Sequence, residues 1–129
     1  HVTEDAKGIA SDRLELHPGD FFRDVLPECD LYVVMEIIHD WPDAESQQIL
    51  ESIRRAAPKG ATLLLLEEIV PEDPGPHWAK VLDVHMLTLL GGKQRTLAEY
   101  ETLLQAAGFK LRREMPTPVG ISIVEAEAV

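Results

Sequence analysis

Short apolar runs alternate with amphipathic stretches along most of the chain. Two largely apolar runs, Leu31–Ile38 and Ala61–Glu68, predict buried strands, because a strand covered on both faces needs no polar side. The second run begins apolar and ends on two acids. Between them, residues 43–57 carry apolar side chains at the spacing of a helix face, and a second helical pattern covers about residues 77–89. A brief alternation at Arg13–His17 predicts one more short strand.

The C-terminal third predicts a helix followed by two strands. Thr96 and Glu99 have the spacing of a capping box, in which each side chain accepts a hydrogen bond from the other residue's backbone amide. A helix should therefore begin at residue 97, and Gly108 should end it. The runs Lys110–Thr117 and Ile121–Ala128 predict strands, joined by a turn short enough for an antiparallel hairpin.

This order of elements favours an α/β fold with a mostly parallel sheet. Strands that alternate with helices form parallel sheets with helices on their faces, and the closing hairpin adds antiparallel pairing at the C-terminus. The length, 129 residues, suits one compact domain.

Composition narrows the classes of partner. The chain has 23 acidic residues against 12 basic ones, so we expect neither nucleic acid nor an anionic membrane as a partner. No apolar run approaches the roughly 20 residues that cross a bilayer. A single cysteine, Cys29, suits a reducing cytoplasm. No cluster of His, Cys and Asp has the spacing of a metal site.

Candidate catalytic residues follow the two predicted buried strands. His39 comes directly after the first strand, and Glu67 and Glu68 end the second. If these strands are parallel neighbours, about 4.8 Å apart, the imidazole and a carboxylate come within hydrogen-bonding distance. The carboxylate would fix the tautomer of the imidazole and leave its other nitrogen free as a base. From these residues alone, a structural histidine and two solvated acids are the alternatives.

Seven short segments together resemble one enzyme family. They are GDFF (19–22), IIHDWPD (37–43), LLEEIVP (65–71), DVHML (83–87), GGKQRT (91–96), AGF (107–109) and the terminal GISIVEA. In this order and near this spacing they resemble the S-adenosylmethionine-dependent O-methyltransferases of small molecules. That family includes plant caffeate and isoflavone enzymes, animal hydroxyindole O-methyltransferase and bacterial polyketide-tailoring enzymes. The resemblance runs from about residue 13 to the C-terminus and implies a Rossmann-like methyltransferase sheet.

The resemblance implies roles for several residues. His39 would be the general base that deprotonates a substrate hydroxyl, so that the oxygen attacks the sulfonium methyl group of S-adenosylmethionine. Glu67 would hold the histidine, with Glu68 as the alternative if the register differs by one. Asp20 and Phe21 would flank the adenine of the cofactor, by hydrogen bonding and by apolar contact.

Four further positions follow from the same resemblance. Met86 falls where the family lines its acceptor pocket, and Asp40, next to the base, would also contact the substrate, although capping of the next helix is an alternative. Met35 occupies a cofactor-side position that often carries Lys in plant members. Gln94 stands where the family usually has a Glu that helps hold the catalytic histidine, and an amide cannot stabilise an imidazolium by charge.

The family's glycine-rich loop, its ribose-binding acid and its N-terminal dimerisation domain have no counterpart in residues 1–129. We therefore expect the C-terminal part of a methyltransferase catalytic domain, from a cytoplasmic, homodimeric enzyme whose acceptor is a small hydroxylated molecule. As an isolated piece we expect it to bind the cofactor poorly. A diverged relative that binds the cofactor without transferring methyl groups, and a folding or interaction module, are the alternative hypotheses.

Overall fold

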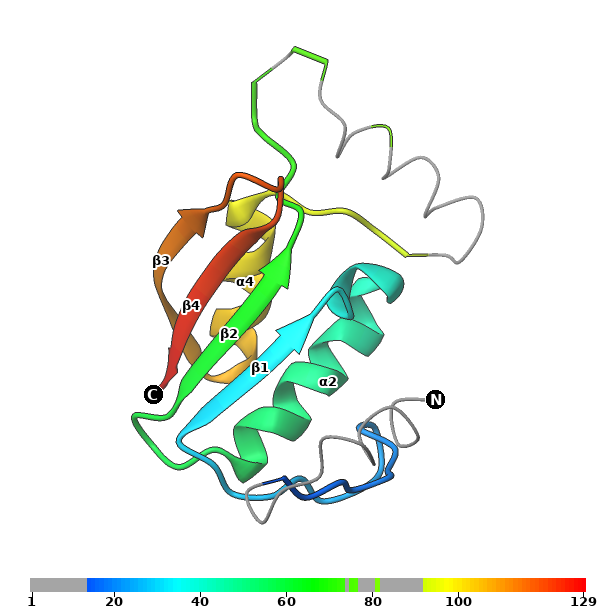
Figure 1. Ribbon diagram of the computed structural model, residues 1–129, viewed down its shortest axis with the longest axis vertical. Helices are drawn as coiled ribbons and strands as arrows, with labels where there is room; N and C mark the ends of the chain where they lie inside the picture. The colour runs from blue at the N-terminus through cyan, green and yellow to red at the C-terminus, as the bar shows by residue number, and fades with distance from the viewer. Residues whose placement is uncertain (1–13, 74, 77–80, 82–91) are drawn as a thin grey trace.

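The structure, a computed structural model, describes residues 14–73, 75–76, 81 and 92–129. Within these residues two helices lie behind one sheet (Figure 1). The predicted helix over residues 77–89, which contains Met86, lies outside the described residues apart from position 81.

The sheet has four strands in the order β1-β2-β4-β3. They are β1 (Leu31–Met35), β2 (Thr62–Glu67), β3 (Phe109–Pro116) and β4 (Ser122–Ala128). β1 is parallel to β2, whereas β4 is antiparallel to both of its neighbours, so β1, β2 and β3 share one direction. The predicted α/β fold with an antiparallel C-terminal hairpin is confirmed. Among the described strands the sheet is mixed, with one parallel pair, and its last strand lies between β2 and β3.

Both helices cover the same face of the sheet. α2 (Asp43–Ala56) lies behind β1 and β2, and α4 (Leu97–Ala107) lies behind the C-terminal strands (Figure 1). The core between the layers is aliphatic apart from Tyr100 and Phe109. Its most buried members are Ile38, Ile49, Leu50, Leu63, Leu65, Tyr100, Leu104, Phe109, Val124, Ala126 and Ala128.

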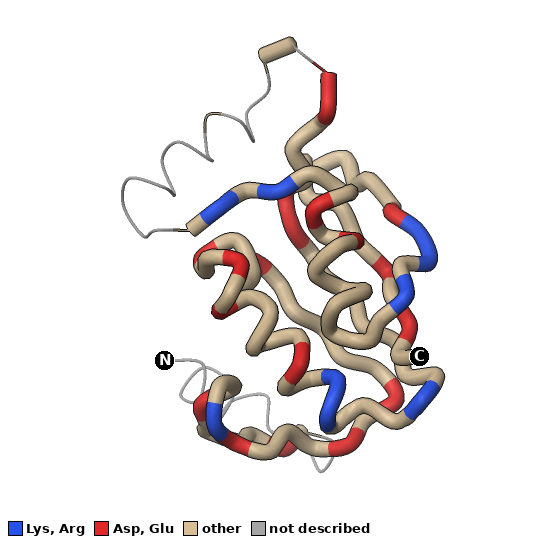
Figure 2. The backbone as a smooth tube through the Cα atoms, turned by 180° about the vertical axis from the view of Figure 1, so that it is seen from behind, with Lys and Arg blue, Asp and Glu red and all other residues tan. Residues whose placement is uncertain are grey.

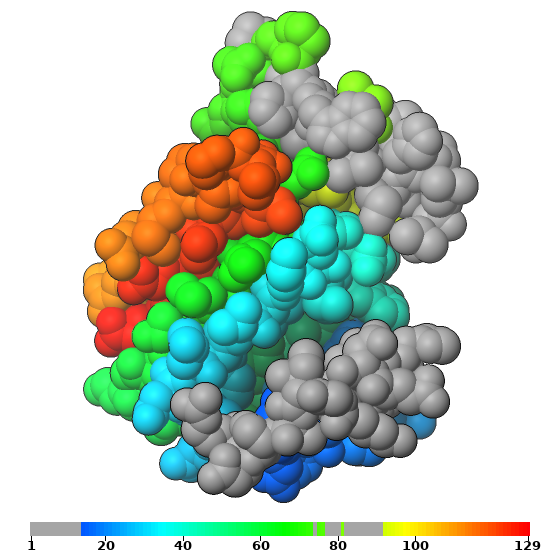
Figure 3. All heavy atoms as spheres, viewed as in Figure 1, coloured from blue at the N-terminus to red at the C-terminus, as the bar shows by residue number. Residues whose placement is uncertain are grey.

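The opposite face of β1 is open. Leu31, Val33 and Met35 are all more than half exposed, and in Figure 3 the strands form a continuous outer surface. β1 is also an edge of the described sheet. The apolar run at 31–38 predicted a strand covered on both faces, and among the described residues this prediction is wrong, because β1 has cover on its helix side only.

The first strand ends three residues earlier than its apolar run predicts. β1 stops at Met35, and Glu36 adopts a left-handed conformation with φ of 50°. The chain then forms a single 3-10 turn, η1 (Ile38–Asp40), before α2. The short strand predicted at Arg13–His17 is absent from its described part, residues 14–17, which is exposed and lies beside no other strand.

Candidate active site

His39 and Glu67 meet at the carboxyl end of the parallel pair β1 and β2. The Nδ1 atom of His39 lies 2.7 Å from Oε2 of Glu67. Glu67 is the last residue of β2 and its side chain is completely buried, whereas Glu68 is half-buried and follows the strand. The predicted contact is therefore present, and Glu67 rather than Glu68 makes it.

Backbone amides hold the second oxygen of Glu67. The N–H groups of Ile37 and Ile38 donate to Oε1, at 3.2 and 2.9 Å. The left-handed Glu36 turns the chain so that these consecutive amides point at one carboxylate, an arrangement that favours anions. Glu36 itself donates its amide to the carbonyl of Leu66 at 2.9 Å. The end of β1 is thus shaped around the carboxylate that contacts His39.

The imidazole is held between two carboxylates. The hydrogen bond to Glu67 raises the pKa of His39 above its ordinary value of 6.5, and burial opposes this shift. Nε2 lies 3.2 Å from Oδ1 of Asp40. Asp40 does not cap α2, because the N-cap residue is Pro42 and no side chain caps that end. The capping role considered for Asp40 is therefore wrong, and its carboxylate instead faces the nitrogen that Glu67 leaves free.

The segment Gly92–Arg95 passes directly against the His39 turn. The amide of Lys93 donates to the carbonyl of His39 at 2.8 Å. A Cβ on Gly92 would lie 2.2 Å from that same oxygen, so the approach requires glycine. Gln94 follows in this segment with its side chain 3% exposed. Gln94 is thus a buried residue of the segment whose Gly92 and Lys93 contact the His39 backbone, and its predicted role in holding the imidazole stays a prediction.

The predicted cofactor residues Asp20 and Phe21 lie beside the same turn. Phe21 and Phe22 contact the ring of Trp41, with centroids 6.2 and 4.9 Å away. Asp20 forms a tight turn in which its Oδ1 accepts from the amide of Phe22 at 2.9 Å. An ionised carboxylate has about four acceptor positions, so Asp20 retains capacity for a ligand donor.

An apolar cavity of about 310 Å³ lies between residues 21–26, β1 and α2. Phe21 and Met35 both line it, together with aliphatic side chains and Tyr32. The faces of a purine ring are flat and apolar, so this lining suits adenine, with Asp20 next in sequence to supply a polar contact. Two of the three predicted cofactor residues therefore share one cavity, and the third adjoins it.

The sequence prediction missed Arg95. Its side chain is completely buried and donates to the carbonyls of Ile38 and Trp41, on either side of His39 and Asp40. Arg95 stands within the GGKQRT segment, but these two partners lie more than 45 residues earlier in the chain, so no local pattern indicated them.

Acidic and basic residues both occur along α2 and along the C-terminal hairpin (Figure 2). Within the described residues, no group of three His, Cys, Asp or Glu side chains could hold a metal ion. In that same part of the chain no helix has the length and apolar character needed to span a membrane.

Comparison with known proteins identifies the family. The family profile of the O-methyltransferase domain matches residues 1–110. The chain belongs to this family. It is 44% identical over 124 residues to phenazine O-methyltransferase PhzM of Lysobacter antibioticus, covering 96% of this chain and 36% of the relative.

Solved structures of the family have the same fold. The crystal structure of LaPhzM matches with a TM-score of 0.90 and 42% identity, over 98% of this chain and 38% of that one. Human N-acetylserotonin methyltransferase in complex with SAM matches with a TM-score of 0.86 and 32% identity. The match covers 92% of this chain and 35% of the human one. This chain therefore spans about a third of the length of the O-methyltransferases that it matches.

Proposed function

We propose that this chain carries the catalytic base of an S-adenosylmethionine-dependent O-methyltransferase that methylates a hydroxyl group of a small aromatic or polyketide-like natural product. The observation that carries the proposal is the 2.7 Å contact between His39 and the buried Glu67 at the carboxyl end of β1 and β2. In open α/β sheets ligands bind at this edge. Membership of the O-methyltransferase family supplies the reaction class.

His39 accepts the substrate proton at Nε2. Glu67 accepts the Nδ1 hydrogen, which fixes the tautomer whose Nε2 carries the lone pair. When Nε2 takes the hydroxyl proton, the resulting imidazolium lies between the carboxylates of Glu67 and Asp40, and both stabilise it. The bound cofactor supplies an electrophilic methyl group. Phenols lose their proton more readily than alcohols, so a base of this strength favours phenolic or enolic acceptors.

Asp20, Phe21 and Met35 form the cofactor side of the site. Phe21 and Met35 contribute apolar walls to the 310 Å³ cavity, and Asp20 offers a carboxylate to the adenine amine. The relative solved with SAM has the same fold, which supports this assignment.

Asp40 and Met86 are proposed to contact the acceptor. Asp40 lies beside the free nitrogen of His39, where the reacting hydroxyl must arrive. The names of two relatives include a phenazine and N-acetylserotonin, both aromatic, and this supports an aromatic acceptor here.

We extend the proposal to the complete enzyme. Residues 1–129 would be the C-terminal part of a methyltransferase catalytic domain, as the resemblance implies, and a longer enzyme is supported by relatives about three times as long. The remaining part would supply the glycine-rich loop for the cofactor and the contacts of a homodimer, and the enzyme would act in the cytoplasm.

A diverged, non-methylating relative is the second candidate, and Gln94 favours it. The amide replaces the family's usual Glu in the buried segment against the His39 turn. In that case the protein would bind S-adenosylmethionine and methylate none of the phenols offered to it. Methyl transfer that appears in Gln94→Glu would instead support the first proposal.

The experiment uses the full-length natural gene product that contains residues 1–129. It is incubated with methyl-labelled S-adenosylmethionine and a panel of phenols, naphthols and hydroxyphenazines, while calorimetry measures cofactor affinity. Labelled methyl ether is expected. Cofactor binding without any methyl ether, in both the natural protein and Gln94→Glu, would overturn the proposed function.

A further inference from the structure

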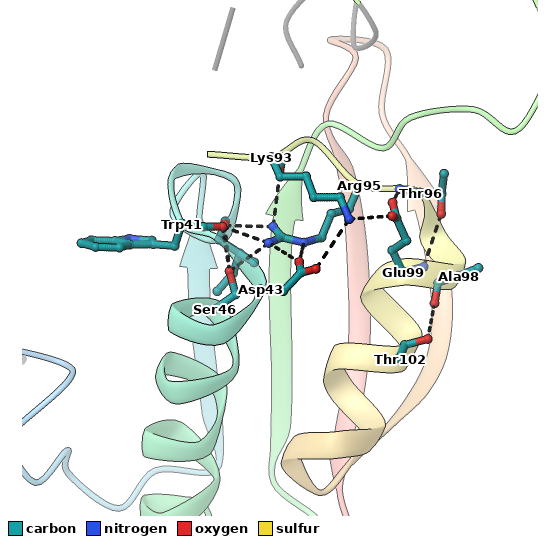
Figure 4. Close-up of polar contacts among 10 residues, drawn as sticks. Trp41, Asp43, Ser46, Lys93, Arg95, Thr96, Ala98, Glu99 and Thr102 are labelled. Atoms are coloured by element: carbon teal, nitrogen blue, oxygen red, sulfur yellow. Dashed lines mark hydrogen bonds and ion pairs between the residues drawn. The ribbon is translucent and has the colours of Figure 1, made fainter. Parts of the chain in front are cut away.

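Arg95 is a fully buried cation at the centre of a hydrogen-bond network. Its guanidinium donates to the backbone carbonyls of Ile38 at 3.1 Å, Lys93 at 3.2 Å and Trp41 at 2.9 Å. Figure 4 shows the side chain lying across the N-terminal end of α2. A buried charge is costly unless its donors are satisfied, so this arrangement requires all of these acceptors in place.

Side chains of α2 fix the guanidinium from its other side. Nε and Nη2 both donate to Oδ1 of Asp43, the first residue of α2, at 2.9 and 2.8 Å. Nη2 also contacts Oγ of Ser46 at 3.2 Å. The hydroxyl of Ser46 in turn donates to the carbonyls of Ile38 and Trp41. Arg95 and Ser46 thus share the same pair of carbonyls.

Those two carbonyls bracket His39 and Asp40. One of the two carbonyls between them, that of His39, accepts from the amide of Lys93 at 2.8 Å. Arg95 is itself fixed to the sheet side of the molecule by a bridge to Ile69, and its carbonyl accepts from Val70. The segment that carries Arg95 therefore fixes the backbone from which the imidazole projects toward Glu67.

We infer that Arg95 is a positioning residue, which holds the backbone of residues 38–41 so that the His39 imidazole stays aligned with Glu67 and the acceptor. This inference rests on the proposed function of His39, but it concerns the geometry of the turn. The planar guanidinium is essential, because it directs donors toward three carbonyls and one carboxylate at once. The ammonium of a lysine retains the charge but presents it from a single nitrogen.

The test is Arg95→Lys in the full-length natural gene product, with two independent readouts. The first is the ¹⁵N-histidine NMR signal of the Nδ1 proton of His39, assigned as the downfield signal that is lost in His39→Gln. We expect this signal to shift upfield and to broaden. The second readout is methyl transfer, for which we expect kcat to fall about 10- to 100-fold with little change in the KM for S-adenosylmethionine, because misplacement of a reacting group by about 1 Å costs this much.

Arg54→Lys is the matched control. Arg54 also donates to three carbonyls, those of Ala57, Gly108 and Val129, but at the opposite end of α2. Its replacement by lysine should lower thermal stability while leaving the His39 signal and kcat as in the natural protein. If Arg95→Lys folds poorly, Asp43→Asn removes the charge of the carboxylate that anchors Arg95, and we expect the same changes to a smaller degree.

The outcomes separate this inference from the proposed function. A His39 signal and a kcat unchanged in Arg95→Lys and Asp43→Asn would overturn the inference. Equal losses in Arg54→Lys would also overturn it, because they would show an effect of general stability. If the natural protein transfers no methyl group, the proposed function fails, and the NMR signal alone decides the role of Arg95.

Discussion

The Nδ1 atom of His39 lies 2.7 Å from Oε2 of Glu67, across the carboxyl ends of two neighbouring parallel strands. The other oxygen of Glu67 accepts two consecutive backbone amides. The carboxylate is therefore held in place before any substrate arrives, and the histidine takes its tautomer from it. The predictions below follow from this pair and from the backbone that surrounds it.

Glu67→Gln should abolish most of the methyl transfer. The amide oxygen would accept the N–H groups of Ile37 and Ile38, so the NH₂ group would face Nδ1 of His39 and donate to it. The imidazole would then carry its hydrogen on Nε2 and offer no base to the acceptor. We expect kcat to fall about 10²- to 10⁴-fold, the usual contribution of a general base. A fall of less than about threefold in steady-state assays would contradict the assigned tautomer.

The pH dependence follows from the raised pKa of His39. The neutral imidazole is the active form, so kcat should rise with pH along a limb centred above 6.5, the ordinary value. A raised folded-state pKa also means that protonation stabilises the fold. This stabilisation is complete below pH 6.5 and is lost as the pH rises through the folded pKa.

Urea unfolding at several pH values tests whether protonation of His39 stabilises the fold. The difference in unfolding free energy between the natural protein and His39→Gln should grow as the pH falls from about 9 to about 6. A difference that shrinks over this range would show that the folded pKa is lowered rather than raised.

Gly92→Ala should disrupt the site through the backbone. The added Cβ would lie 2.2 Å from the carbonyl of His39 and 3.1 Å from backbone atoms of Asp40. Since no flexible side chain can yield, the turn must move, at a cost of about 1 to 3 kcal/mol. The midpoint temperature of thermal unfolding and the kcat of methyl transfer should both fall.

Gly75→Ala is the control for this change. There the added Cβ meets a carboxylate oxygen of Asp73 at 2.8 Å, the movable end of a side chain. We expect natural stability and activity for Gly75→Ala. If the two variants have equal stability and activity, the close approach of Gly92 to the carbonyl of His39 is not what the site requires.

Thr96→Ala should weaken the start of α4. Thr96 Oγ1 accepts from the amide of Glu99 at 3.3 Å, and Glu99 Oε2 accepts from the amide of Thr96 at 2.9 Å. Loss of such a cap costs about 1 kcal/mol in denaturant unfolding. Thr102→Ala, on the exposed part of the same helix, should cost almost nothing, because alanine has the higher helix propensity. If Thr102→Ala lowers the free energy of unfolding more than Thr96→Ala does, the capping role of Thr96 is contradicted.

The meeting of His39 and Glu67 follows from the sequence because parallel strands bring their carboxyl ends to one edge of a sheet. That rule needs only the two apolar runs and the helix between them, so the meeting of His39 with an acid at the end of β2 could be predicted. The capping box of Thr96 and Glu99 was equally local, since both partners lie within one turn. The predicted hairpin also formed, with Gly120 at a φ of 88° in its turn.

Other features depend on contacts that no local pattern encodes. Glu36 adopts a left-handed φ that glycine usually supplies, and it does so where the chain turns to place two amides on a carboxylate from another strand. This is why β1 ends before its apolar run does. Arg95 looks like a surface cation in sequence, and its burial is explained by distant acceptors, the carbonyls of Ile38 and Trp41 and the carboxylate of Asp43.

The most direct test of His39 as the general base is the single-turnover rate of methyl transfer by His39→Ala in the full-length natural gene product. Because Nε2 of His39 is the base, the rate should fall about 10²- to 10⁴-fold. The affinity for S-adenosylmethionine, measured by calorimetry, should change little, since the proposed cofactor residues are intact. A His39→Ala protein that transfers methyl groups at nearly the natural rate would show that His39 is not the base.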